Sequence, residues 1–198
     1  MYYHCRPLKY VEYGKVFPPP VNTLDEYFVK CYKWLGYYCK FYPQVWLSRG
    51  NLSLTGFKRE FKKEQEVILF GFENIVGFPV SFEPWEYIMN TLMNDKSDDI
   101  AKINKQIAKD FEDLRRDSIA EKWEPDMDLK GWIDCGRDVN AYFKKHLFVE
   151  KDQVVVPSLN LKTAKQVICR NERQKKILRH MGFIEDRIVI KNFKTSRW

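Results

Sequence analysis

The sequence predicts an α+β fold for this chain of 198 residues. Apolar residues at three- and four-residue steps mark helices, and short runs of β-branched and aromatic residues mark strands. We therefore expect a small mixed or antiparallel sheet with flanking helices and a strand-helix-strand unit at the C-terminal end. The composition, with 44% apolar and 31% charged residues, is typical of a globular chain. The length favours a single domain over residues 1–198.

The first part of the chain predicts a strand, a helix and then three further strands. Residues 1–5 form the first strand, and the proline run at 18–20 closes the irregular stretch behind it, because proline cannot continue a helix. A helix is expected over 23–42, with Thr23 as its N-cap. The composition then becomes rich in strand-forming residues at 44–48, 66–72 and 78–82.

Two helices follow. The first begins near Pro84, and the second, longer one begins behind Ser97 and its two following aspartates. The second helix has to end before Pro125. Its apolar stripe indicates a face packed on a core, and the stripe consists of Ile100, Ile103, Ile107, Phe111 and Leu114.

The last part of the chain has the clearest secondary-structure signals. A short helix is expected over 138–147 and an extended segment over 153–157. A strand over 165–169 leads into a helix over 172–180, and a strand over 187–190 follows. The helix has clear boundary signals, which are Asn171 as N-cap and Gly182 just behind its end.

The positive charge of the chain is concentrated near its end. Of the formal net charge of +7, residues 162–198 carry eleven Lys or Arg against three acidic residues, so the rest is about neutral. A cationic face attracts anionic partners such as nucleic acid or an acidic protein, and Lys175, Lys176 and Arg179 are the candidate contacts. A solvated surface that only keeps the chain soluble is the alternative, since no RNP, KH, zinc-finger or helix-turn-helix signature accompanies the charge.

Several classes of protein are disfavoured. The five cysteines form no CxxC pair and there are three histidines, so we expect reduced thiols and no metal site. No apolar run reaches membrane-spanning length, and the first residues carry no secretory signal, so we expect no membrane association and a cytoplasmic location. The P-loop, GxGxxG, GxSxG, HExxH and kinase motifs are missing from the sequence.

One acidic segment is a weak candidate for metal-dependent nuclease chemistry. Asp126 and Asp128 with Lys130 have the spacing of a D-x-D-x-K arrangement, in which carboxylates hold Mg²⁺ and lysine steers the attacking water. Such residues belong on paired strands, whereas this stretch follows a proline and is expected to form a loop. A solvated turn is therefore the alternative.

Three short segments together resemble a known family. They are Tyr2-Tyr3-His4-Cys5-Arg6-Pro7 with Gly14-Lys15-Val16-Phe17-Pro18, then Val45-Trp46-Leu47-Ser48, and finally Asp152-Gln153-Val154-Val155-Val156-Pro157. Their order is similar to that of the small bacterial ADP-ribosyltransferases of the rifampin-modifying type. The similar segments cover about a fifth of the chain.

The resemblance implies an NAD⁺ site. In it His4 hydrogen-bonds the ribose, Trp46 stacks on the nicotinamide, and Ser48 lies beside them as a further cofactor contact. A carboxylate stabilises the oxocarbenium-like ribosyl centre. The family's glutamate corresponds to Gln153 here, which carries no charge, and Glu150 stands three residues upstream.

Two functions of different classes thus remain open. One is an NAD-dependent ADP-ribosyltransferase, or a degenerate relative, that modifies a macromolecular or small-molecule acceptor. The other is a non-enzymatic protein, for example of a phage, mobile element or defence system, that binds nucleic acid or an acidic protein through residues 162–198.

Overall fold

A computed structural model gives the structure of the protein. It describes residues 1–11, 15–16, 26–42, 44–50, 66–95, 97–122, 128–149 and 152–191. The chain forms two compact units, a sheet unit of residues 1–18, 45–77 and 152–198 and a helical unit of residues 19–44 and 78–151. The α+β class is confirmed. The assignment of residues 1–198 to a single domain stays a prediction.

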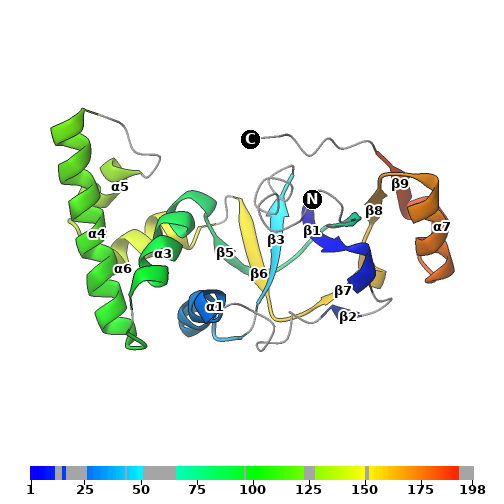
Figure 1. Ribbon diagram of the computed structural model, residues 1–198, viewed down its shortest axis with the longest axis horizontal. Helices are drawn as coiled ribbons and strands as arrows, with labels where there is room; N and C mark the ends of the chain where they lie inside the picture. Colours follow the sequence, from blue (N-terminus) through cyan, green and yellow to red (C-terminus); the bar gives the residue numbers. More distant parts are fainter. Residues whose placement is uncertain are drawn as a thin grey trace. The chain divides into compact units, whose positions relative to one another are not determined.

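The sheet unit is built on a mixed sheet (Figure 1). Its strands follow the order β6-β3-β1-β4-β8-β9. All neighbours in this order pair antiparallel except β8 and β9, which pair parallel. A separate antiparallel pair joins β2 to β7. The bounds are β1 (Tyr2–Pro7), β2 (Lys15–Val16), β3 (Val45–Arg49), β4 (Val67–Phe72), β6 (Gln153–Val156), β7 (Leu159–Asn160), β8 (Gln166–Cys169) and β9 (Ile188–Ile190).

The expected strand-helix-strand unit is confirmed as β8, helix α7 (Glu172–His180) and β9, and Figure 1 shows α7 alongside the two strands. The side chain of Asn171 caps the helix by accepting from the backbone N–H of Gln174 at 2.9 Å. Gly182 follows the helix with φ of +94°, a conformation that glycine adopts without strain. Parallel strands need such a crossover, because a tight turn cannot join them.

The core of the sheet unit lies mainly on one face of the sheet. Alternate residues of a strand point to opposite faces, so Tyr2, Leu47 and Phe70 share this face. Leu178 of α7 is fully buried in the same cluster. Burial of such side chains contributes about 1.5–3 kcal/mol each, which fixes the helix against the sheet.

The helical unit holds α1 (Glu26–Cys39), α3 (Phe82–Asn94), α4 (Ile100–Glu121), α5 (Leu129–Asp134), α6 (Val139–Tyr142) and the short strand β5 (Phe78–Val80). A π-helical turn (Phe143–Leu147) continues α6, and single 3₁₀ turns occur in the sheet unit at Leu8–Tyr10, Leu161–Thr163 and Glu185–Arg187. Aromatic rings form the centre of the helical unit. Trp34 packs edge-on against Phe143 at 5.3 Å between ring centroids, and Phe111 does so against Trp132 at 5.2 Å.

The predicted stripe of the long helix is largely confirmed, since Ile103, Ile107 and Phe111 are buried. Ile100 and Leu114 at the edges of the stripe are partly exposed. The expectation of a loop around Asp128 is wrong, because this residue is the N-cap of α5. The strands expected at 66–72, 78–82 and 153–157 are observed as β4, β5 and β6, but β5 ends at Val80 and Phe82 already begins α3.

Some sequence expectations lie outside the described residues. They concern Thr23, the prolines at 18–20 and Pro125.

Asp99 begins the longest helix of the described chain. Its carboxylate accepts from the backbone N–H of Ala101 at 2.8 Å and from that of Lys102 at 3.3 Å. We expect Asp99→Ala to lower the free energy of unfolding by about 1 kcal/mol, because two N–H groups lose their acceptor. Asp98→Ala is the matched control, and it should change the value by less than about 0.5 kcal/mol. Urea denaturation of both variants measures the difference, and equal effects would contradict the capping role.

Candidate functional site

Three neighbouring strands carry most of the residues that the resemblance singles out. His4 is on β1, Trp46 and Ser48 are on β3, and Gln153 is on β6. Since β3 lies between β1 and β6 in the sheet, segments from the two ends of the sequence are brought side by side. Glu150 lies outside the described residues.

Ser48 and Gln153 form a direct pair. They are opposite each other in the β3–β6 ladder, and the Nε2 of Gln153 donates to the Oγ of Ser48 at 3.2 Å. Both side chains are buried. The Oε1 of Gln153 has no hydrogen-bond partner in the described part of the chain. A buried acceptor without a donor costs about 1–3 kcal/mol, so this oxygen is a position that a ligand donor would satisfy.

His4 is the second buried group with an open acceptor. Its Nδ1 lies 3.0 Å from the main-chain oxygen of Trp46. A carbonyl only accepts, so Nδ1 carries the proton and Nε2 of the neutral ring is an acceptor. This Nε2 is buried and has no partner among the described residues. Burial lowers the pKa of His4 from 6.5 to about 4, the hydrogen bond to Trp46 opposes this shift, and Arg6 adds to it.

The ladder between β1 and β3 is short. The ladder between β1 and β3 pairs Tyr2 with Arg49 and Tyr3 with Ser48, and no further pair is formed between these two strands. On its other side β1 pairs with β4 along its whole length. We call the stretch between β1 and β3 beyond the Tyr3–Ser48 pair the seam. At the seam the Trp46 carbonyl accepts from the His4 imidazole.

The predicted site residues do not all share one face of the sheet. His4 pairs with Phe70 and therefore lies on the face of the main core. Trp46 and Ser48 alternate with Leu47, a residue of that core, so they lie on the opposite face, as does Gln153. The contact between His4 and the others is its hydrogen bond to the main-chain oxygen of Trp46, so the structure does not bring the four side chains together on one face.

The nuclease-like segment does not have the geometry that this chemistry needs. Asp128 and Lys130 lie at the start of α5 rather than on paired strands. The carboxylate of Asp128 accepts from the Gly131 N–H at 2.7 Å, and its second oxygen is 3.2 Å from the Nδ1 of His146. Lys130 pairs with Asp134 at the surface. Asp126 lies outside the described residues.

Metal binding and thiol chemistry have little support in the described part of the chain. Among the described residues, no three His, Cys, Asp or Glu side chains gather as metal ligands would. All five cysteines are free and buried. Burial raises the pKa of Cys5 and of Cys31 to about 12, so these thiols stay protonated at neutral pH.

The three cations predicted for partner binding lie on α7 but differ in their pairing. Lys175 and Arg179 both contact Glu185, at 3.5 and 3.2 Å. Lys176 is exposed, and it forms no ion pair with any residue of the described chain. The charge of Lys176 is therefore fully available to a partner, while that of the other two is partly balanced.

A groove in the helical unit was not predicted. It has a volume of about 630 Å³, and its polar lining includes Tyr37, Tyr38, Asn104, Lys105, Arg137 and Asn140. These residues come from three segments that only the fold brings together. A sequence signal exists for one part, since Ala101, Lys105 and Ala108 recur at helical steps beside the apolar stripe of α4.

Comparison of the chain with protein-family models, curated proteins and solved structures finds no match. Within the described residues, none of the helices combines the length and the apolar character needed to cross a membrane. The ADP-ribosyltransferase resemblance, NAD⁺ as cofactor and the cytoplasmic location thus stay predictions.

The depressed pKa of His4 makes stability depend on pH. The unfolded chain binds a proton at this histidine below about pH 6.5, whereas the folded chain does so only near pH 4. The stability that the buried, neutral His4 contributes is therefore present above about pH 6.5, and it is lost as the pH falls toward 4. Between pH 7 and 5 we expect a loss of about 2 kcal/mol from this group.

Urea denaturation of the wild type and of His4→Asn at both pH values isolates the contribution, because asparagine keeps a donor but does not titrate. The same pH dependence in both proteins would show that His4 does not cause it.

Proposed function

We propose that this chain is an ADP-ribosyltransferase-like domain that binds NAD⁺ at the seam between β1 and β3. One observation carries the proposal. Two buried acceptors, Nε2 of His4 and Oε1 of Gln153, flank β3 without any donor in the described chain. NAD⁺ offers the matching groups, since its ribose hydroxyls and its carboxamide N–H₂ all donate hydrogen bonds.

The positions of the resembling segments support the same ligand. The Ser48–Gln153 hydrogen bond fixes the Gln153 amide, which holds one acceptor in a defined orientation. Because His4 lies on the other face, the ligand would reach it where the β1–β3 ladder stops. Trp46, beside the seam on β3, is the aromatic that would stack on the nicotinamide.

Binding and transfer make different demands on the residues. Stabilisation of a positive ribosyl centre needs a negative charge, and removal of such a preorganised group commonly costs 100- to 1,000-fold in rate. Gln153 supplies a hydrogen bond without charge, so we expect NAD⁺ binding with slow transfer. Any remaining transfer would depend on Glu150.

Measurements of NAD⁺ binding and of transfer test the proposal. Titration calorimetry with NAD⁺ should show saturable binding, and Ser48→Ala should weaken it about tenfold because the Gln153 amide loses its partner. Ser158→Ala, an exposed serine of the same unit, should bind as the wild type does. With labelled NAD⁺ and cell extract, Gln153→Glu should raise transfer at least about tenfold.

Glu150→Gln should abolish whatever transfer the wild type has. If the folded wild type neither binds NAD⁺ nor transfers label, the proposal is wrong.

A second candidate function is binding of nucleic acid through α7. The exposed arc of this helix carries Arg173, Lys176, Arg179 and His180. Residues three positions apart are separated by about 4.5 Å along a helix axis, so the cations form a row. A row of charges suits a polyanion better than a single phosphate.

The inward side of α7 supports this role, because it holds the helix still. Gln174 and Leu178 are buried, and the Oε1 of Gln174 accepts from the backbone N–H of Arg170 at 2.7 Å. Among the described residues, Glu66 pairs with Arg173 and Glu185 pairs with Lys175 and Arg179, whereas Lys176 forms no ion pair. Among the three predicted contacts, Lys176 should matter most.

Salt titration of binding to a single-stranded oligonucleotide tests the second candidate. Lys176→Glu should weaken binding and reduce the slope of log K against log salt by about one unit or more, since a phosphate contact is lost. Lys109→Glu, a reversal on α4 of the helical unit, is the control and should leave both quantities unchanged. Salt-independent binding, or a preference for an acidic peptide over the oligonucleotide, would count against nucleic acid.

A further inference from the structure

The groove of the helical unit has the features of a ligand site that is separate from the seam. Its walls come from α1, from α4 and from the turn that leads into α6. The volume of about 630 Å³ is in the range of small-molecule sites, which is about 300–1,000 Å³. Every residue of the lining belongs to the helical unit.

One side of the groove is held by a chain of two hydrogen bonds. The Nε1 of Trp34, a fully buried residue, donates to the Oδ1 of Asn104 at 3.1 Å. The Nδ2 of Asn104 donates in turn to the hydroxyl of Tyr38 at 2.7 Å. These bonds connect the buried Trp34 to Asn104 and Tyr38 of the lining, so they give the groove a fixed shape before a ligand binds.

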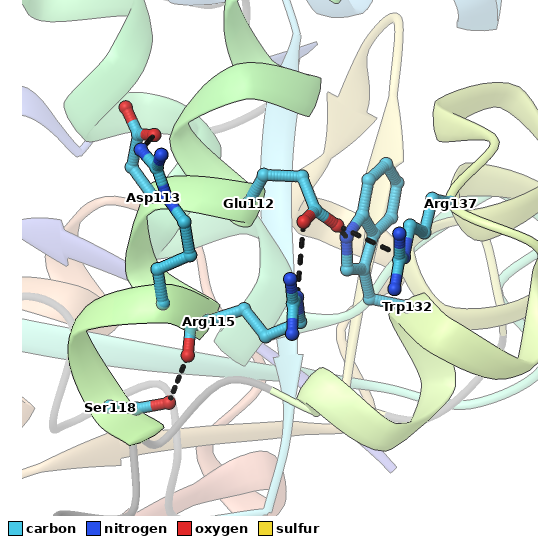
Figure 2. Close-up of polar contacts among 7 residues, drawn as sticks. Glu112, Asp113, Arg115, Ser118, Trp132 and Arg137 are labelled. Atoms are coloured by element: carbon cyan, nitrogen blue, oxygen red, sulfur yellow. Dashed lines mark hydrogen bonds and ion pairs between the residues drawn. The ribbon is translucent and has the colours of Figure 1, made fainter. Parts of the chain in front are cut away.

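Two cations lie at the groove. Lys105 is exposed on α4 and has no ion-pair partner in the described chain. Arg137 is oriented by Glu112, whose Oε1 lies 3.4 Å from its Nε, as Figure 2 shows. This contact leaves the two terminal nitrogens of the guanidinium available. One carboxylate, that of Asp138, also lines the groove, and it accepts from the Ala141 N–H at 2.8 Å.

Glu112 is itself firmly held. It accepts from the Nε1 of Trp132 at 2.7 Å and from the Nε of Arg115 at 3.0 Å (Figure 2). Burial opposes ionisation of this carboxyl, but the bonds from Trp132 and Arg115 keep its pKa below the usual value. The carboxylate therefore stays ionised at neutral pH and keeps Arg137 in position.

The remaining part of the groove suits a flat ring. Tyr37 is 54% exposed, with Lys40 over its ring at 4.6 Å and the ring of Tyr38 edge-on at 5.1 Å. Asn140 is exposed, and its side-chain amide forms no hydrogen bond to the described residues. An aromatic surface, a free amide and two cations in one groove are complementary to a base joined to a phosphate.

We propose that this groove binds a nucleoside monophosphate, with the phosphate between Lys105 and Arg137 and the base against Tyr37. The phosphate takes charge-assisted hydrogen bonds from both cations. Asn140 offers a donor and an acceptor to the edge of the base. The site is independent of the seam, because it uses none of the residues assigned to NAD⁺.

Calorimetry with AMP on the full chain tests the site. AMP should bind saturably, and adenosine and inorganic phosphate should each bind at least about tenfold more weakly, since each offers half of the contacts. Lys105→Glu and Tyr37→Ala should each weaken AMP binding about tenfold. Lys109→Glu, a charge reversal on the same helix outside the groove, is the matched control and should have no effect.

The result separates this site from the seam. Ser48→Ala should leave AMP binding unchanged, whereas Lys105→Glu should leave the contacts at His4 and Gln153 unchanged. If folded wild-type protein does not bind AMP, or if Lys105→Glu and Lys109→Glu weaken binding equally, the groove is not a nucleotide site.

Discussion

The pairing of β1 with β4 is the constraint on which the sheet unit depends. It runs over the whole of β1, from Tyr2 opposite Phe72 to Pro7 opposite Val67. A shift by one residue would turn His4 and the core residue Tyr2 to the wrong face. The buried side chains on both strands therefore fix a single register, and every other strand of the sheet is positioned by it.

The ladder between β1 and β3 is short, in contrast to the ladder between β1 and β4, which covers the whole of β1. Since β1 is held firmly by β4, it does not need a full ladder on its other side. The carbonyl of Trp46 accepts from the His4 ring, so a side chain contributes to the contact between the two strands. The stability that β4 supplies to β1 thus permits a shorter ladder between β1 and β3.

Local signals predicted much of the fold. The boundaries of α7 follow from Asn171 and Gly182, and the start of α4 follows from Asp99, because these residues satisfy or end the helix backbone themselves. The sequence does not predict α5, because Asp128 fits the pattern of a metal ligand as well as that of a helix cap. The short strands β2 and β7 were also missed, since two residues give no periodicity.

The sites were less predictable than the elements. Adjacent placement of His4, Ser48 and Gln153 requires the strand order, and a pattern of single residues contains no such information. Their division between the two faces follows from alternation only once the register is known. The groove depends on a tertiary hydrogen bond from Trp34 to Asn104, residues seventy positions apart. No local sequence signal predicts this bond.

The interleaving of the two units has a consequence for how the chain acquires its structure. β1, at the centre of the sheet, is made before its neighbours β3 and β4, and the strands outside these, β6, β8 and β9, come from residues beyond 152. The ribosome therefore releases the whole helical unit before the sheet has its edge strands. Closing such distant pairings is slow, so the nascent sheet residues would stay exposed to chaperones for most of synthesis.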